Sequence, residues 1–254
     1  MPLNISQSEI IEIGNLLRSN LLDSSPRHAA LYKNFISHCE RERGFLVSRI
    51  NDEIGPEVEA IGRTKTTGTL RSKLLTNPKY LLTNIRDVVG ARLTLDCTLD
   101  EQDEMARRLT SIFEGKVTPI DRRTKPMCGY RALHLEVRLD GIRGEIQIRT
   151  DIQAQWANAY EELADRWGRQ IRYGEPPNGI NAMHIAARSE LIEMLIALSL
   201  HDFAYLEENH NELRRRLGSN LEANSDQFEE YLRVTRGQAQ ESLERLKIMT
   251  WEAE

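Results

Sequence analysis

The chain has 254 residues, of which 40% are hydrophobic and 29% charged, and its formal net charge is −5. This composition excludes a disordered or membrane-embedded chain and predicts a globular protein with one sizeable core and helical flanks. The acidic balance excludes coating of nucleic acid over the whole surface, which needs a broad basic field, but allows a local basic patch. The N-terminus has neither the basic start nor the apolar run of a signal peptide, and no segment is apolar enough to cross a bilayer. We therefore expect a cytoplasmic protein with no membrane partner.

Helical and strand patterns alternate in the first third of the chain. Apolar residues recur at helical spacing over 7–20 and 27–53, which predicts two opening helices. Residues 57–63 alternate in the manner of a strand, and Thr66 or Thr67 is suited to cap the helix that follows.

Strands dominate the middle of the chain and helices the last third. Pro119 cannot donate a ladder hydrogen bond, so the segment around it is at best a short edge strand. The predicted elements are a strand at 88–96, a helix at 99–113, the edge strand at 117–120, strands at 132–139 and 145–150, and helices at about 151–169, 181–216 and 224–250.

This order predicts an α+β fold, in which a central mixed sheet is flanked by N-terminal and C-terminal helices. We expect the helices of residues 1–54 to pack on a catalytic core at 55–169, followed by a helical extension at 170–254. The three cysteines are odd in number, far apart and without ligand-spaced histidines, so we expect reduced thiols.

A basic segment runs from Gly62 to Lys73. It holds four basic residues, four threonines, one serine and two glycines, and no acid. Fixed cations, hydroxyl donors and the free N–H groups of a helix start suit a polyphosphate ligand. A solvated turn between a strand and a helix explains the same composition, and there is no Walker glycine–lysine pattern.

A polar sheet face is predicted from the hairpin that turns at Asp140-Gly141. Leu133, Leu135 and Val137 alternate onto one face, where Ile146 and Ile148 can join them. A solvated outer face looks similar, but Glu145 and Gln147 are not strand formers, which favours a functional face. The residues that share this polar face are His134, Glu136, Glu145, Gln147 and Arg149.

Asp87 begins the strong strand pattern and is the second candidate carboxylate. In strict alternation Asp87 and Arg92 face opposite ways, so we expect a bulge at Gly90 that turns both toward one cleft. The alternative for Asp87 is an ordinary turn residue at the entry of a strand. If Asp87 and Glu145 converge, they form a site for Mg²⁺, which prefers oxygen ligands and bridges to substrate phosphates. By contrast, the His201-Asp202 step is interpreted as structural, because a metal site needs further ligands nearby.

Four blocks in order resemble one family. Residues 63–73, 87–92, 129–134 and 145–150 are similar to the ATP-binding segment, the metal-binding strand, the acceptor loop and the second catalytic strand of the RelA/SpoT alarmone synthetase domain, particularly in its small single-domain members. The resemblance covers about residues 55–165. It implies a nucleotidyltransferase-like synthetase fold and transfer of the β,γ-pyrophosphate of ATP to a ribose 3′-hydroxyl, with release of AMP.

The resemblance also implies roles on the donor side. Arg63 and Arg92 would hold adenine between them, which suits planar guanidinium groups. Asp87 and Glu145 would serve the metal, and Glu145 would orient or deprotonate the attacking hydroxyl. The implied ATP-binding residues are Arg63, Lys65, Thr66, Thr69, Lys73 and Arg92.

On the acceptor side, the resemblance implies that Tyr130 stacks on the acceptor base and His134 contacts its phosphates. The chain departs from the family in the stretch Asp121–Cys128, which lacks the usual Tyr, reverses Lys and Pro and is one residue shorter; Ala132 also replaces Ser. These departures leave the acceptor open. The candidate acceptor-binding residues are Arg122, Arg123, Lys125, Tyr130, His134, Gln147 and Arg149.

The sequence is compatible with several functions. The first is synthesis of guanosine alarmones, (p)ppGpp, from ATP and GDP or GTP. The second is a toxin that pyrophosphorylates the 3′ end of tRNA, for which the basic residues of 122–125 would contact phosphates. An adenosine nucleotide is a third acceptor, and an inactive nucleotide sensor is the non-enzymatic alternative. The apolar stripes of the flanking helices have three alternative explanations: they complete the core, they mediate homo-oligomerisation, or they bind a partner such as an antitoxin.

Overall fold

A computed structural model of the chain describes residues 5–55, 58–76, 79–113, 115–217, 230, 233–234 and 237–245. The chain divides into two compact units that interleave along the sequence. The first unit contains Met1–Leu93, Met105–Ile120 and His134–Ile148, and the second contains Thr94–Glu104, Asp121–Leu133 and Arg149–Glu254. The three-part division at residues 54/55 and 169/170 stays a prediction.

One five-stranded mixed sheet confirms the α+β class, with strand order β1-β2-β5-β4-β3. β1 pairs with β2 in antiparallel register, and β3, which contains Pro119, lies at the sheet edge as predicted. The strands are β1 (Ile61–Thr64), β2 (Val89–Leu95), β3 (Val117–Asp121), β4 (Leu133–Arg138) and β5 (Arg143–Thr150).

The predicted alternation of β4 and β5 is confirmed. Their apolar side chains are all buried: Leu133, Leu135, Val137, Ile146 and Ile148. This buried face fixes which side chains appear on the opposite face, because a slip of one residue would exchange the two sets. Of the polar set predicted from the sequence, Glu145 contacts both His134 and Gln147.

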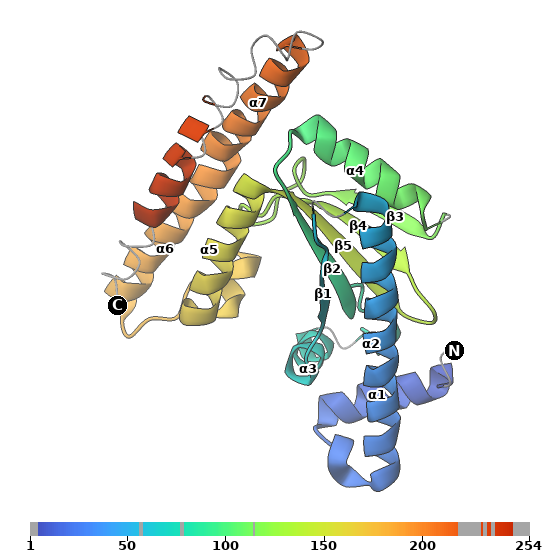
Figure 1. Cartoon of the computed structure of the whole chain (residues 1–254). Helices are drawn as coiled ribbons and strands as arrows, with labels where there is room; N and C mark the ends of the chain where they lie inside the picture. The colour runs from blue at the N-terminus through green and yellow to red at the C-terminus, as the bar shows by residue number, and fades with distance from the viewer. Residues whose placement is uncertain are drawn as a thin grey trace. The chain divides into compact units, whose positions relative to one another are not determined.

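Three helices belong to the first unit, α1 (Gln7–Ser19), α2 (Pro26–Ile54) and α3 (Thr67–Thr76), and α4 (Leu99–Ser111) begins in the second unit and ends in the first (Figure 1). Short 3₁₀ turns lie at Leu22–Ser24 and Leu82–Asn84. The N-terminus of α2 is fixed by Pro26 in its first turn and by Ser25, whose hydroxyl accepts from a backbone N–H.

β1 lies very close to α2. A Cβ atom added at Gly62 would lie 2.7 Å from Cγ2 of Val47 and 3.1 Å from Cγ of Arg43. Only glycine fits this approach without a shift of the helix side chains. The contact fixes β1, and with it Arg63, against α2.

The second unit is largely helical (Figure 1). α5 (Asp151–Trp167) leads into a 3₁₀ turn at Arg169–Tyr173, and the helix predicted at 181–216 is α6 (Ala182–Ala197), a π-helix at Leu198–Phe203, and α7 (Ala204–Leu217). Buried side chains from these helices form one cluster that includes Trp156, Leu195 and Phe203.

The helix predicted at 224–250 lies only partly within the described residues. Residues 230, 233–234 and 237–245 are helical, and Ala239 and Leu243 join the buried cluster of the second unit. In the part of the chain that the structure describes, no helix has both the length and the apolar character to cross a membrane.

Candidate functional site

A pocket in the first unit brings together both carboxylates predicted from the sequence. Asp87 and Glu145 line it together with Arg63 and Arg92. These four side chains come from β1, β2, β5 and the turn before β2. The complete lining is Ile61, Arg63, Asp87, Gly90, Ala91, Arg92, Glu145 and Gln147.

Asp87 is held by two lysines of the basic segment. Its carboxylate oxygens lie 2.9 Å from Nζ of Lys65 and 2.7 Å from Nζ of Lys73. Burial opposes ionisation of this carboxyl, but the two ammonium groups outweigh burial and lower its pKa below the ordinary value. The basic segment and Asp87 therefore form one charged cluster in the folded protein.

Lys65 is the most enclosed cation of this cluster, with its side chain only 4% exposed. Burial lowers the pKa of its ammonium group, and the charge of Asp87 offsets part of that effect. A buried ammonium needs an anionic partner, since its desolvation is otherwise uncompensated. An anionic ligand that binds Lys65 would therefore replace Asp87 as the partner of its ammonium group.

Glu145 forms a second cluster with two neighbours on the polar face of the hairpin. Its carboxylate lies 2.9 Å from Nδ1 of His134 and accepts a 2.8 Å hydrogen bond from Nε2 of Gln147. Burial favours its neutral form, but the contacts with His134 and Gln147 prevail and lower its pKa. The charge of Asp87 opposes this lowering, as expected for two acids in one pocket.

The bulge expected at Gly90 is not present in the β1–β2 ladder. Arg63 pairs with Gly90 and Thr64 with Val89, one residue against one. Asp87 reaches the pocket for a different reason, because it precedes β2 and is not bound by the strict alternation of the strand. The expected bulge is therefore absent from the β1–β2 ladder, whereas Asp87 and Arg92 do line one pocket.

Thr66 of the basic segment caps the start of α3. Oγ1 of Thr66 accepts from the backbone N–H of Thr69 at 3.3 Å, and the two hydroxyls lie 2.9 Å apart. The hydroxyl of Thr67 contacts that of Tyr32 at 2.6 Å. The cap places Thr66 and Thr69 at the N-terminus of a helix, where anions are favoured.

Carboxylate oxygens of Asp87 and Glu145 are the donors that a hard divalent cation prefers. Both acids line one pocket and both have lowered pKa values, so the donor set fits Mg²⁺ chemically. Their present partners are the ammonium groups of two lysines, an imidazole and an amide.

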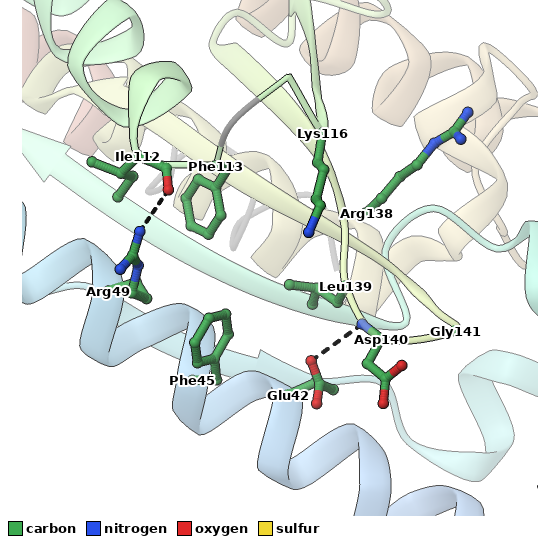
Figure 2. Close-up of a pocket in the computed structure, with 10 residues that line it drawn as sticks. All are labelled: Glu42, Phe45, Arg49, Ile112, Phe113, Lys116, Arg138, Leu139, Asp140 and Gly141. Atoms are coloured by element: carbon green, nitrogen blue, oxygen red, sulfur yellow. Dashed lines mark hydrogen bonds between the residues drawn. The ribbon is translucent and has the colours of Figure 1, made fainter. Parts of the chain in front are cut away.

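A second hollow in the first unit also holds acids, with a volume of about 920 Å³ (Figure 2). Two of its lining residues, Glu42 and Asp140, form with His38 the one group of at least three metal-ligating side chains found among the described residues. However, Nε2 of His38 donates to the Asp140 carbonyl at 2.6 Å, and its Nδ1 accepts from Arg41 at 3.3 Å. With both ring nitrogens engaged, His38 is a structural link and not a metal ligand.

In the second unit, the structure brings together two of the predicted acceptor residues. The hydroxyl of Tyr130 accepts hydrogen bonds from Nε and Nη2 of Arg149, at 3.2 and 2.9 Å. The guanidinium carbon lies 5.0 Å from the centre of the Tyr130 ring. Arg149 is 3% exposed, so its buried guanidinium group orients the Tyr130 hydroxyl from the protein interior.

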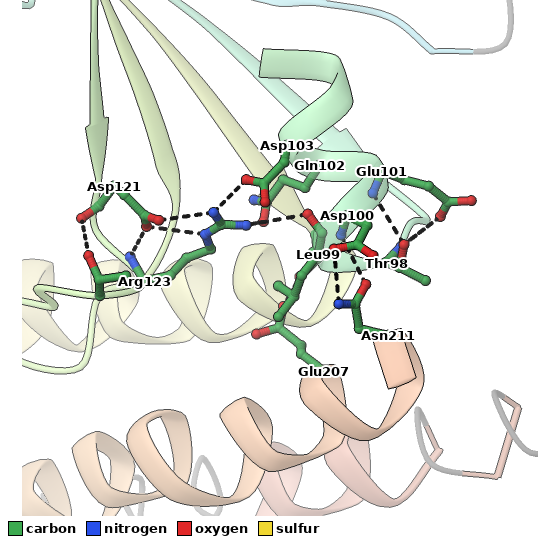
Figure 3. Close-up of polar contacts among 12 residues, drawn as sticks. Thr98, Leu99, Asp100, Glu101, Gln102, Asp103, Asp121, Arg123, Glu207 and Asn211 are labelled. Carbon is green, nitrogen blue, oxygen red and sulfur yellow. Dashed lines mark hydrogen bonds and ion pairs between the residues drawn. The ribbon is translucent and has the colours of Figure 1, made fainter. Parts of the chain in front are cut away.

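The other predicted acceptor residues of this unit are the cations Arg122, Arg123 and Lys125. Lys125 is exposed and Arg122 half-buried. The guanidinium of Arg123 is already engaged by the carboxylates of Asp103 and Asp121, the side chain of Gln102 and the carbonyl of Leu99 (Figure 3). Arg123 therefore stabilises this turn. Arg122 and Lys125 are better placed to bind an incoming anion.

Sequence reasoning missed two contacts, one in each unit. It assigned His134 to acceptor phosphates, but did not foresee that His134 pairs with Glu145. It also gave no role to Glu207, which is buried and lies 2.6 Å from Arg131. The shared face of the hairpin was a signal for the first contact, whereas the second pair joins segments far apart in the sequence and no local pattern marks it.

The middle of the chain is similar to a known protein family. Residues 62–166 match the family described as the region found in RelA / SpoT proteins. Uncharacterized proteins of Mycobacterium tuberculosis (strain H37Rv) and Mycobacterium bovis are each 41% identical over 158 residues. The match covers 59% of this chain and 58% of each relative, so the chain spans less than two thirds of these relatives.

Solved structures agree in fold. The small alarmone synthetase 1 from Bacillus subtilis, bound to its product pppGpp, has a TM-score of 0.52 at 18% identity, covering 73% of this chain and 97% of that chain. A protein of Streptococcus mutans UA159 has a TM-score of 0.51 at 19% identity, covering 76% and 98%. Residues 62–166 are thus similar to the region found in RelA / SpoT proteins, in a chain whose fold is similar to that of the small alarmone synthetases.

Proposed function

We propose that this chain is an ATP-dependent pyrophosphokinase that transfers the β,γ-pyrophosphate of ATP to the 3′-hydroxyl of GDP or GTP. The observation that carries the proposal is the pocket that Asp87 and Glu145 line together with Arg63 and Arg92. Such a pocket combines metal-binding acids with guanidinium groups that suit a nucleobase. The RelA/SpoT region at residues 62–166 supports the same chemistry.

The basic segment would hold the donor. Lys65 and Lys73 would exchange Asp87 for the phosphates of ATP, and Thr66 and Thr69 would bind them at the start of α3. Arg63 and Arg92, which line the same pocket, would enclose the adenine. Positioning and charge neutralisation are the main requirements of phosphoryl-type transfer, so fixed cations suit the reaction.

Glu145 would act on the acceptor. Its lowered pKa keeps it ionised near neutral pH, where a carboxylate can orient or accept the proton of the attacking hydroxyl. Asp87 and Glu145 would hold Mg²⁺, which when bound would neutralise charge on the transferred phosphates. His134 and Gln147 keep the Glu145 carboxylate in place.

The acceptor would be bound by Tyr130, with its base stacked on the ring that Arg149 orients. A guanosine nucleotide is preferred as the acceptor because the fold is that of a small alarmone synthetase crystallised with pppGpp. Its phosphates would contact Arg122 and Lys125.

A second candidate is pyrophosphorylation of the 3′ end of tRNA by the same donor pocket. The half-buried Arg122 and the exposed Lys125 favour it, because phosphate contacts along an RNA end need cations on an accessible turn. An antitoxin partner would accompany such a toxin.

The decisive experiment incubates the purified protein with γ-labelled ATP and Mg²⁺, and separately adds GDP, GTP, tRNA or no further acceptor. We expect label in a guanosine product and release of AMP. Label on tRNA alone would replace the alarmone proposal with the second candidate, and label in the ATP-only reaction would indicate an adenosine acceptor. If the protein binds ATP but transfers label to no acceptor, the nucleotide sensor is the alternative that remains.

A further inference from the structure

The loop that carries Tyr130 has an unusual backbone. Cys128 and Gly129 both have positive φ angles, 49° and 80°. The backbone N–H of Tyr130 donates to the carbonyl of Met127 at 3.0 Å, which closes a tight turn. A left-handed backbone at a residue other than glycine is uncommon and persists where surrounding contacts hold it.

Those contacts come from the helices of the second unit. A Cβ atom at Gly129 would lie 2.6 Å from the Trp156 ring and 3.1 Å from Cα of Ile196. The hydroxyl of Ser199 donates to the Gly129 carbonyl at 2.6 Å, and Ser199 is buried. Ser199 lies in the π-helix at Leu198–Phe203, a helix form that often marks a functional position.

A buried acid on α7 holds the residue that follows Tyr130. Oε2 of Glu207 lies 2.6 Å from Nη1 of Arg131, and the two side chains are 5% and 6% exposed. The other oxygen, Oε1, accepts from the hydroxyl of Thr150 and from Nε2 of Gln153. Through one carboxylate, Glu207 therefore connects the loop that carries Tyr130 and Arg131 to the end of β5.

The two segments joined by Glu207 also carry the proposed acceptor pair. Arg131 follows Tyr130 in the sequence, and Thr150 follows Arg149. Tyr130 and Arg149 hydrogen-bond to each other. Each segment thus directs one side chain to its partner in the pair and the next side chain to Glu207.

We propose that Glu207 and Ser199 are positioning residues that set the orientation of the Tyr130–Arg149 pair for the acceptor nucleotide. This inference rests on the proposed function. It assigns the α6–α7 segment a part in acceptor binding, although none of its side chains needs to touch the acceptor. The expected signature is a change in acceptor affinity without a matching change at the ATP pocket.

Glu207→Gln is the first test, because it keeps the shape of the side chain and removes the charge that faces Arg131. We expect the KM for the acceptor to rise about tenfold or more, with kcat at saturating acceptor and the affinity for a non-hydrolysable ATP analogue changed less than about threefold. Glu208→Gln is the matched control, since Glu208 is the neighbouring exposed acid on α7, and it should behave as wild type.

Ser199→Ala is a milder second variant that removes only the hydrogen bond to Gly129. We expect an acceptor KM raised about three- to tenfold. The combination with Glu207→Gln should give less than the product of the separate effects, because both variants release the same loop.

The conformation of the loop that carries Tyr130 can also be measured without substrate. The alkylation rate of Cys128 in the full chain, measured by mass spectrometry of its peptide, should increase about threefold or more in Glu207→Gln when the loop opens locally. Cys39 is the internal reference, since burial raises the pKa of its thiol to about 12. The Tm, measured alongside, shows whether a variant is folded.

The outcomes separate this inference from the proposed function. An unchanged acceptor KM together with an unchanged Cys128 rate in folded Glu207→Gln overturns it, as does an equal loss of ATP-analogue affinity. Absence of transfer by the wild-type chain overturns the proposed function; the Cys128 rates of the two variants then still decide whether Glu207 and Ser199 hold the loop. If Glu207→Gln does not fold, an unchanged KM and Cys128 rate in Ser199→Ala overturns the inference.

Discussion

The two units use charge in opposite ways. In the first unit, Lys65 and Lys73 share the carboxylate of Asp87 at the pocket, and the side chains of Lys73, Asp87 and Lys65 are 35%, 24% and 4% exposed. In the second unit, Arg131 and Glu207 are paired at 6% and 5% exposure, and two further hydrogen bonds engage the acid.

This difference separates exchangeable charge from fixed charge. In the first unit, the partly exposed Lys73 can leave Asp87 at little cost, since such pairs contribute little net free energy, whereas the buried Lys65 must exchange one anion for another. A buried pair cannot give up one partner, because its removal leaves an uncompensated charge that costs about 3–5 kcal/mol. The first unit is therefore suited to binding and chemistry, and the second to holding a loop in shape.

Glu145→Gln should cause the largest loss. It removes the carboxylate that would receive the proton and serve the metal, so we expect transfer to fall by about 10³ or more. Affinity for an ATP analogue should change less than about threefold. Glu136→Gln is the control on the same face, where Glu136 pairs with Arg86, and it should keep its activity. Wild-type turnover in Glu145→Gln would contradict the central assignment.

Gly129→Ala should damage the second unit. The added methyl meets the Trp156 ring at 2.6 Å and must accept a φ of 80°. We expect about 2–4 kcal/mol of lost stability, measured by urea unfolding, and a raised acceptor KM. Gly44→Ala, in a helix with open space around the new Cβ, should be neutral or slightly stabilising. Equal behaviour of the two variants would remove the argument for a tightly held loop.

Lys65→Ala should weaken the donor side alone. Loss of one charge-assisted phosphate contact predicts an affinity for the ATP analogue reduced by about tenfold or more, measured by calorimetry. The acceptor KM should stay within about threefold of wild type. Lys33→Ala, an exposed position on α2, is the control. Equal ATP-analogue affinities in Lys65→Ala and wild type would show that Lys65 only neutralises Asp87.

The smallest expected effect is on acid stability. The pKa of Asp87 is lowered in the folded protein, so its stabilising contribution is complete above its unfolded pKa and is lost as pH falls through the folded value. The free energy of unfolding should therefore decrease as pH falls below about 4, and Asp87→Asn should make this decrease shallower. The exposed Asp23→Asn should not change the slope, and parallel slopes for Asp87→Asn and wild type would exclude the linkage.

Much of the fold was predictable because it follows local periodicity. The alternation over Leu133–Arg138 and the helical spacing over Gln7–Ser19 each determine one element and its buried face. Pro119 alone was enough to place β3 at the sheet edge.

The parts that were not predictable depend on contacts between distant segments. The π-helix at Leu198–Phe203 interrupts a continuous helical pattern, and Ser199 within it meets Gly129 from 70 positions away. Asp87 does line one pocket with Glu145, but the bulge expected to bring it there is absent from the β1–β2 ladder, because strict alternation was applied to a residue that lies before the strand.

The close approach of β1 to α2 at Gly62 has an evolutionary consequence. Since a methyl group at residue 62 would meet Val47 at 2.7 Å, the two positions cannot enlarge independently. Among homologues we expect glycine at 62 wherever a branched residue occupies position 47, and substitution of the glycine only in lineages where that neighbour has become smaller. The two positions should therefore covary, although neither side chain takes part in the proposed reaction.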